Sequence, residues 1–100
     1  MYTYTTPTIT CKLNGLEFSQ VEFVRIAIKG INKNLIKVVP VEDFDTETGE
    51  TSISLTQEET AALGAGQVEI QARVKYLDGN VQPTNKIKKN MNEIIDKVVI

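Results

Sequence analysis

The sequence predicts an all-β protein, namely an immunoglobulin-like β-sandwich of six to seven strands with one short helical crossover. Three features support this prediction: regular alternation of apolar and polar residues from Val68 to Tyr76, a capped helical segment at residues 56–63, and an Asp78-Gly79 turn. A short helix, a long amphipathic strand and a hairpin in this order are typical of one half of a two-sheet sandwich. One hundred residues are a common size for one domain, so we expect residues 1–100 to share a single core.

The first two predicted strands lie at residues 3–13 and 21–29. Residues 3–13 are rich in Thr, Tyr and Ile, and Pro7 places them at a sheet edge because proline cannot donate a ladder hydrogen bond. An Asn14-Gly15 turn follows. The core face of the second strand is expected to carry Val24, Ile26 and Ile28. Its other face is only half polar, so we expect something to cover it; its apolar residues are Val21, Phe23 and Ala27.

The middle of the chain predicts two shorter strands and an acidic hairpin. Residues 35–41 form the third predicted strand, and Pro40 places this strand, or its end, at an edge. Residues 42–50 are expected to form a solvated hairpin tip that leads into a fourth strand at residues 51–55.

A helical crossover is predicted at residues 56–63. Thr56 and Glu59 have the spacing of a capping box, and Gly64 stands where a helix commonly ends in a left-handed residue. So short a helix is unstable alone, and we expect Leu63 to pack it against the core. Together with this helix, the predicted core contains Val24, Ile26, Leu55, Leu63, Val68, Ile70 and Val74.

The last quarter of the chain predicts a hairpin and a C-terminal docking segment. Residues 81–89 are expected to pair with the alternating strand, with Pro83 at an edge. Residues 90–100 have apolar residues at helical spacing, although their β-branched end would suit a strand equally well. We expect a short helical turn that runs into an extended end.

Composition and charge exclude several classes of function. Apolar residues make up 41% and charged residues 24%, which is ordinary for a globular protein. A net charge of −2 gives no electrostatic case for a nucleic-acid or anionic-membrane partner. The chain lacks both a signal-peptide pattern and an apolar run of about 20 residues, so we expect a soluble protein made in the cytoplasm. Cys11 is the one cysteine, and we expect it to be a small buried apolar residue.

The sequence predicts no enzyme, no cofactor and no metal site. Without histidine and with one cysteine, the usual zinc, copper and iron sites and the His-activated nucleophiles are excluded. The acidic residues 43–50 alternate as in a calcium loop, but Thr48 and Ser54 stand at the sixth and twelfth positions, where glycine and glutamate are required. A solvated hairpin tip is therefore the better interpretation. The cluster of Lys86, Lys88 and Lys89 is typical of a protected sheet edge.

Four segments in order carry a family resemblance: residues 14–19, 54–60, 66–71 and 89–91. They resemble the small β-sandwich proteins encoded among the virion structural genes of phages and prophages of Gram-positive gut bacteria. The chain is more distantly similar to the N-terminal domain of baseplate upper proteins. The most specific part is Leu-Thr-Gln-Glu-Glu-Thr at residues 55–60, followed by Gly-x-Val-x-Ile-Gln at residues 66–71. These positions are structural, so the resemblance implies a fold and a context but no active site; residues 35–50 are longer than the family pattern.

These observations predict a non-enzymatic virion structural or accessory protein, associated with the tail or baseplate. It would be made in the host cytoplasm, localise to the virion, and contact other virion proteins or copies of itself as a homo-oligomer. The alternative is a small phage-encoded inhibitor that binds a host protein. Large apolar side chains rarely crowd an unanchored terminus, so we expect the partner-binding residues to be Ile94, Ile95, Val98, Val99 and Ile100.

Overall fold

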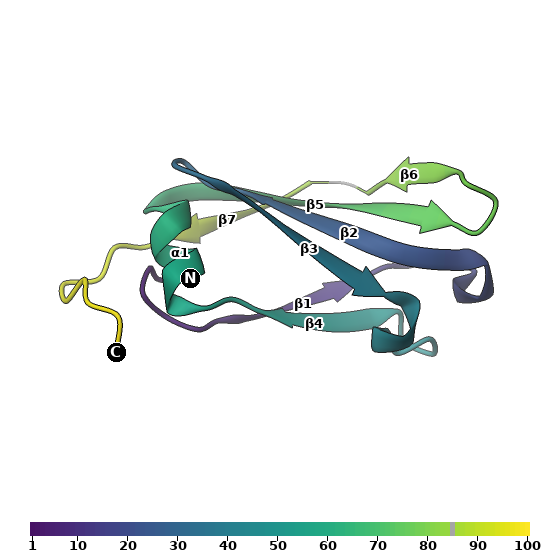
Figure 1. Ribbon diagram of the computed structural model, residues 1–100, viewed down its shortest axis with the longest axis horizontal. Coiled ribbons are helices and arrows are strands. Elements are labelled where there is room, and N and C mark those ends of the chain that lie inside the picture. The colour runs from purple at the N-terminus through teal and green to yellow at the C-terminus, as the bar shows by residue number, and fades with distance from the viewer. Residues whose placement is uncertain (85) are drawn as a thin grey trace.

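The computed structural model describes residues 1–84 and 86–100, which form two facing β-sheets and one α-helix (Figure 1). Two 3₁₀ turns, Phe18–Gln20 and Val41–Asp43, flank the strands at one end. The described strands and helix are, in order, β1 (Thr8–Lys12), β2 (Val21–Lys29), β3 (Asn34–Pro40), β4 (Glu50–Ser54), α1 (Gln57–Leu63), β5 (Gly66–Tyr76), β6 (Val81–Pro83) and β7 (Ile87–Met91).

The two sheets are unequal in width. The large sheet has the order β3-β2-β5, and β6 and β7 then pair with successive parts of the remaining edge of β5. The small sheet contains only β1 and β4, and all pairings between the named strands are antiparallel. The chain crosses from the small sheet to the large one through α1, which confirms the all-β class and the short helical crossover.

The start of α1 has the predicted capping box. The Thr56 hydroxyl accepts a hydrogen bond from the Glu59 amide at 3.1 Å, and the Glu59 carboxylate accepts one from the Thr56 amide at 3.0 Å. These bonds satisfy two backbone donors that a helix start otherwise leaves unpaired.

The core lies between the inner faces of the two sheets. Ile26 and Ile28 of β2 and Val68 of β5 are fully buried, and Ile9 and Ile53 cover them from the small sheet. Each of the seven predicted core residues is buried, as the alternation requires. The rings of Phe18 and Phe44, whose centroids are 5.4 Å apart, pack beside this cluster.

Val21 is a correction to the predicted faces of β2. We expected it beside Phe23 on the outer face, but it is 3% exposed and belongs to the core. The pairing of β2 with β5 shifts between Val21 and Phe23, which face Tyr76 and Lys75, so Glu22 is an extra residue in the ladder. Such a bulge reverses the alternation beyond it, which turns Val21 inward.

Three predicted segments near the ends of the chain also differ. Of residues 3–13, only β1 is a strand, and residues 81–89 contain two separate strands, β6 and the start of β7. The helical turn expected after residue 90 is wrong. Met91 pairs with Gly66 and is buried, and the Asn92 backbone bonds Met1 and Thr3. Since these contacts hold residues 90–92 extended, they are incompatible with a helix start.

Candidate interaction site

The apolar residues predicted to bind a partner lie in residues 93–100, which we call the tail. The tail leaves β7 at one end of the molecule and lies beside α1 (Figure 1). Met91 anchors its start in the core, and the Asn92 amide donates to the Met1 carbonyl at 2.7 Å. Beyond Asn92 the tail has neither helix nor strand.

Most apolar side chains of the tail face solvent. Ile95 and Ile100 are fully exposed, Val98 is 59% exposed and Val99 is 45% exposed, whereas Ile94 is half-buried. The structure therefore brings all five predicted residues together on one short segment and leaves four of them uncovered. Contiguous exposed apolar side chains are uncommon on soluble monomers and often mark a contact surface.

Few polar contacts hold the tail in place. The Gln57 side chain accepts from the Ile100 amide at 2.8 Å and donates to the Ile100 carbonyl at 2.5 Å. Within the tail, the ion pair of Lys97 with Glu93 lowers the pKa of the Glu93 carboxyl and raises that of the Lys97 ammonium. Both groups are exposed to solvent, where an ion pair contributes little to stability. Beyond Asn92, few polar contacts therefore tie the tail to the rest of the domain.

The outer face of β2 is not where the tail lies. We expected something to cover this half-apolar face, but the tail does not, because Gln57 holds its last residue beside α1. The face itself keeps Phe23 and Ala27 half-buried, with the Lys75 ammonium 5.6 Å from the centre of the Phe23 ring. It also carries two like charges directly opposite each other, Arg25 and Arg73.

The acidic residues 42–50 do not form the predicted hairpin tip, because they connect β3 of the large sheet to β4 of the small sheet. A turn within this segment is closed by the bridge between Asp45 and Glu50 and by further hydrogen bonds. The Asp45 carboxylate accepts from the Glu47 amide at 3.0 Å, and the Thr51 hydroxyl donates to the Asp43 carbonyl at 3.0 Å. Among residues 1–84 and 86–100, no cluster of three or more His, Cys, Asp or Glu side chains has a geometry that could hold a metal ion. The same residues contain no helix long and apolar enough to cross a membrane.

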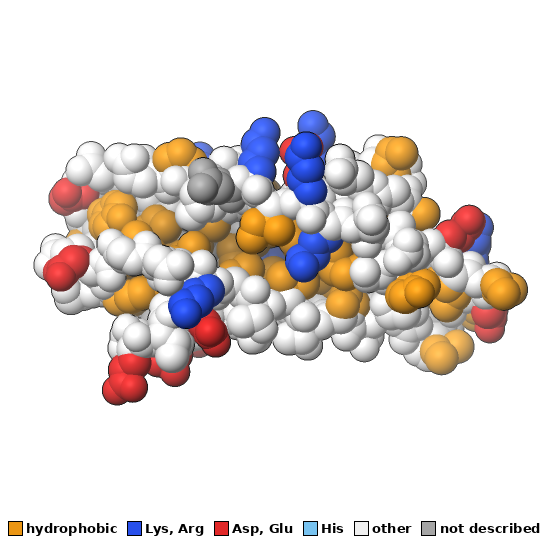
Figure 2. Space-filling model, turned by 180° about the vertical axis from the view of Figure 1, so that it is seen from behind, with side chains coloured by type: hydrophobic (Ala, Val, Ile, Leu, Met, Phe, Trp, Pro, Cys, Tyr) orange, Lys and Arg blue, Asp and Glu red, His pale blue; other side chains and the backbone are white. Residues whose placement is uncertain are grey.

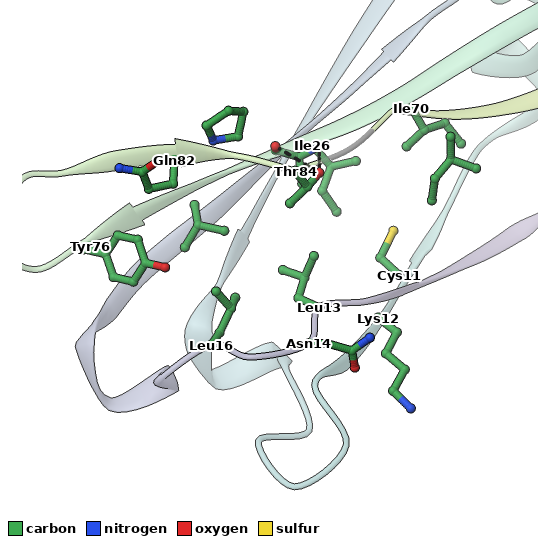
Figure 3. Close-up of a pocket in the computed structure, with 14 residues that line it drawn as sticks. Cys11, Lys12, Leu13, Asn14, Leu16, Ile26, Ile70, Tyr76, Gln82 and Thr84 are labelled. Carbon is green, nitrogen blue, oxygen red and sulfur yellow. Dashed lines mark hydrogen bonds between the residues drawn. The ribbon is translucent and has the colours of Figure 1, made fainter.

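A groove beside β1 was not predicted from the sequence; we call it the β1 groove. It has a volume of about 450 Å³ and lies between β1 with its following loop on one side and β6 with the start of β7 on the other (Figure 3). Cys11, Leu13 and Leu16 point into it from the β1 side, toward Ile26 and Ile70 of the large sheet (Figure 3). Burial raises the pKa of the Cys11 thiol.

The unequal width of the sheets creates this groove, which is why local patterns did not reveal it. Alternation identifies which residues of a strand face inward, but it does not say how many strands the opposite sheet contains. One signal was available in the sequence. Cys11 and Leu13 continue the inward face of a strand that was predicted to lie at a sheet edge, so apolar side chains were expected beside an unpaired edge.

Comparison with known proteins finds no matching family model, no similar curated protein and no matching solved structure.

Proposed function

We propose that this chain is a non-enzymatic structural or accessory component of a phage particle, associated with the tail or baseplate, that acts through protein–protein contacts. The exposed apolar tail on a small two-sheet domain is the observation that carries the proposal. Burying a large aliphatic side chain contributes about 1.5–3 kcal/mol, so a partner that covers four of them gains considerable binding free energy.

The resemblance in the sequence supplies the phage context. Its most specific residues lie in the cap and body of α1 and at the start of β5, where they support the fold. We also propose that the fold is an immunoglobulin-like sandwich. Support comes from two facing antiparallel sheets joined by a short helix, although the second sheet is only two strands wide.

The proposed role in a particle predicts where the protein is found. Mass spectrometry of purified phage particles should detect the chain at many copies per particle. A chain that is absent from particles and made early in infection would instead fit the inhibitor, and the structural role would be wrong.

The proposed role of the tail predicts the effect of its removal. Deleting residues 94–100 should lower the mass of the oligomer in light scattering, because the deletion removes the apolar contact surface. The far-UV circular dichroism should stay that of a folded β protein, since the exposed side chains lie outside the core. A matched variant with Ser at the five apolar positions keeps the chain length and should behave the same way. An unfolded deletion variant would mean that the tail belongs to its own core, and an unchanged mass would also contradict the proposal.

A further inference from the structure

We propose that the tail of one copy adds as a β-strand to the free edge of β1 in a second copy and fills the β1 groove. This inference rests on the proposed function, because it names the surface that receives the tail. The partner is a second copy of this chain, and the contact combines backbone hydrogen bonds with apolar side chains in a groove, as in other cases of strand addition.

Within the part of the chain that the structure describes, no strand lies beside the edge of β1 that borders the groove. β1 pairs only with β4, and residues of β1 but none of β4 line the groove, so the groove lies on the unpaired side. At one end of β1 the Pro7 carbonyl accepts a hydrogen bond from the Leu55 amide, and at the other end the Leu13 amide donates to the Gly49 carbonyl. Both of these bonds point toward the β4 side. Since an antiparallel strand alternates the direction of its bonds, the backbone N–H and C=O groups of Thr8, Thr10 and Lys12 point toward the groove. An edge of this kind is a template for another strand.

The inner face of the large sheet is uncovered at the same place. The small sheet is two strands wide and lies over β2 and β5, whereas none of the described strands lies opposite β6 and β7. Ile87 pairs with Ile70 and therefore shares its inner face, yet Ile87 is 52% exposed. One more strand beside β1, at the usual spacing of about 4.8 Å, would cover Ile87. At the opposite edge of the large sheet, Glu59 of α1 forms an ion pair with Lys37 of β3 and so partly covers the inner face there.

The tail has the length and the side chains for this position. The last seven residues of the tail, from Ile94 to Ile100, span about 23 Å when extended, more than the five residues of β1. In a strand, Ile94, Val98 and Ile100 would share one face with Asp96, and this face would point into the groove.

The charges around the groove complement those of the tail. Lys89, which pairs with Val68, lies on the inner face of β7, whereas the Lys12 side chain points away from the groove (Figure 3). Figure 2 shows hydrophobic side chains in a band along the middle of one side of the molecule, with cationic and anionic side chains around it. The tail carries Glu93 and Asp96 against one Lys97, so its net charge is −1 (one cation minus two anions). Opposite charges of this kind favour the tail as the occupant.

The tail of the same copy is directed away from its own groove. Its start is bonded to Met1 and Thr3 through Asn92, and its end is bonded to Gln57 of α1, at the end of the molecule (Figure 1). These contacts favour exchange between copies over a tail that folds back on its own subunit.

A proline in the free edge tests the backbone contacts. Thr10→Pro removes an N–H that points toward the groove and not toward β4, so the domain should fold as before. We expect self-association to weaken by about ten-fold or more in light scattering over a concentration series, because the added strand loses a hydrogen bond and is obstructed by the ring. Thr10→Ala, which keeps the N–H, is the matched control and should associate as the wild type does. Equal association of the two variants would overturn the proposal.

Cysteine cross-linking tests the position of the tail even if the proline variant fails to fold. Val98→Cys adds a thiol on the face proposed to enter the groove, where Cys11 is the only other cysteine. Oxidation at alkaline pH, required because the pKa of Cys11 is raised, should link residue 98 to Cys11. Mixing isotope-labelled with unlabelled protein and sequencing the linked peptides should show links between different chains. Lys97→Cys, on the opposite face, is the control and should link several-fold less.

Each other result of this experiment contradicts the proposal. Links within one chain would mean that the tail fills its own groove, absent links would mean that it lies elsewhere, and equal links from both positions would mean that it is not an ordered strand. If deletion of the tail lowers the oligomer mass while the Thr10 and cross-linking experiments fail, the proposed function stands and the β1 groove is not the receptor. If deletion leaves the mass unchanged, both proposals fail.

Discussion

Thr60 joins the N-terminal segment to the helix through a single buried hydroxyl. It has no solvent exposure, and its oxygen lies 3.1 Å from the Thr5 carbonyl, which accepts its hydrogen bond. The same oxygen accepts from the Thr5 amide at 3.2 Å. Because one hydroxyl pairs with both backbone groups of Thr5, it fixes the path of the chain that leads into β1.

Replacing this hydroxyl by a methyl group should be costly. Thr60→Val keeps the shape of the side chain but removes the partner of the partly buried amide and carbonyl of Thr5, so we expect a loss of about 1–3 kcal/mol in the free energy of unfolding. Urea denaturation measures this loss. Thr60→Ser keeps the hydroxyl and should cost less; if the two variants lose equal stability, the hydrogen bonds at this site contribute nothing.

Among the elements, α1 depends on its neighbours because it has only seven residues. Leu63 is fully buried beneath it, and Glu59 reaches Lys37 of β3 at 2.6 Å. The hydrogen bond from Lys37, followed by that from the Thr56 amide, lowers the pKa of the Glu59 carboxyl. A carboxyl with a lowered pKa in the folded state stabilises the protein above its ordinary pKa, and this contribution is lost as the pH falls through the lowered value.

Removing the cation should therefore reduce the sensitivity to acid. In Lys37→Gln the pKa of Glu59 moves back toward its ordinary value, so less stability should be lost when urea denaturation is repeated at acidic instead of neutral pH. We expect a difference of up to about 1 kcal/mol, since both side chains remain partly exposed. Lys33→Gln removes the same charge from an exposed loop and is the control. An unchanged acid dependence in Lys37→Gln would contradict the proposed pairing.

For the whole molecule, the important feature is the difference between a small sheet of two strands and a large sheet twice as wide. The domain is elongated, with extents of 46 × 21 × 17 Å, and the tail leaves from one end while the β1 groove runs along a side. If two copies exchange tails reciprocally, the assembly closes as a dimer; if each tail enters the next copy without closure, the assembly grows as a chain.

The sequence predicted what depends on neighbours along the chain. The alternation of Val68 to Tyr76 gave β5, and the Thr56–Glu59 spacing gave the start of α1, because both patterns follow from local geometry. Val21 was misplaced because the bulge at Glu22 depends on pairing with β5. Met91 was misplaced in a helix because its partner Gly66 is far away in the sequence.

The tail could be predicted from local sequence, whereas the β1 groove, its proposed receptor, could not. The apolar residues of the tail can be recognised in the sequence as a local cluster. They are exposed in the structure because none of the other described elements covers them. The β1 groove combines residues 11–16 with residues 82–87, which meet only after both sheets have formed. No local pattern contains that information.

The contact between the first residues and Asn92 also determines when the chain can finish folding. Met1 bonds Asn90, 89 positions away, and β1 reaches β4 across about 40 residues, as the Thr10–Ser52 pair shows. Proteins dominated by such distant pairings fold in about milliseconds to seconds, far more slowly than the microseconds of an isolated hairpin. Stopped-flow refolding followed by tyrosine fluorescence should show this range, and microsecond folding would contradict it. Because Met1 and Thr3 hold Asn92, the tail takes its position on the domain only when the two ends of the chain have met.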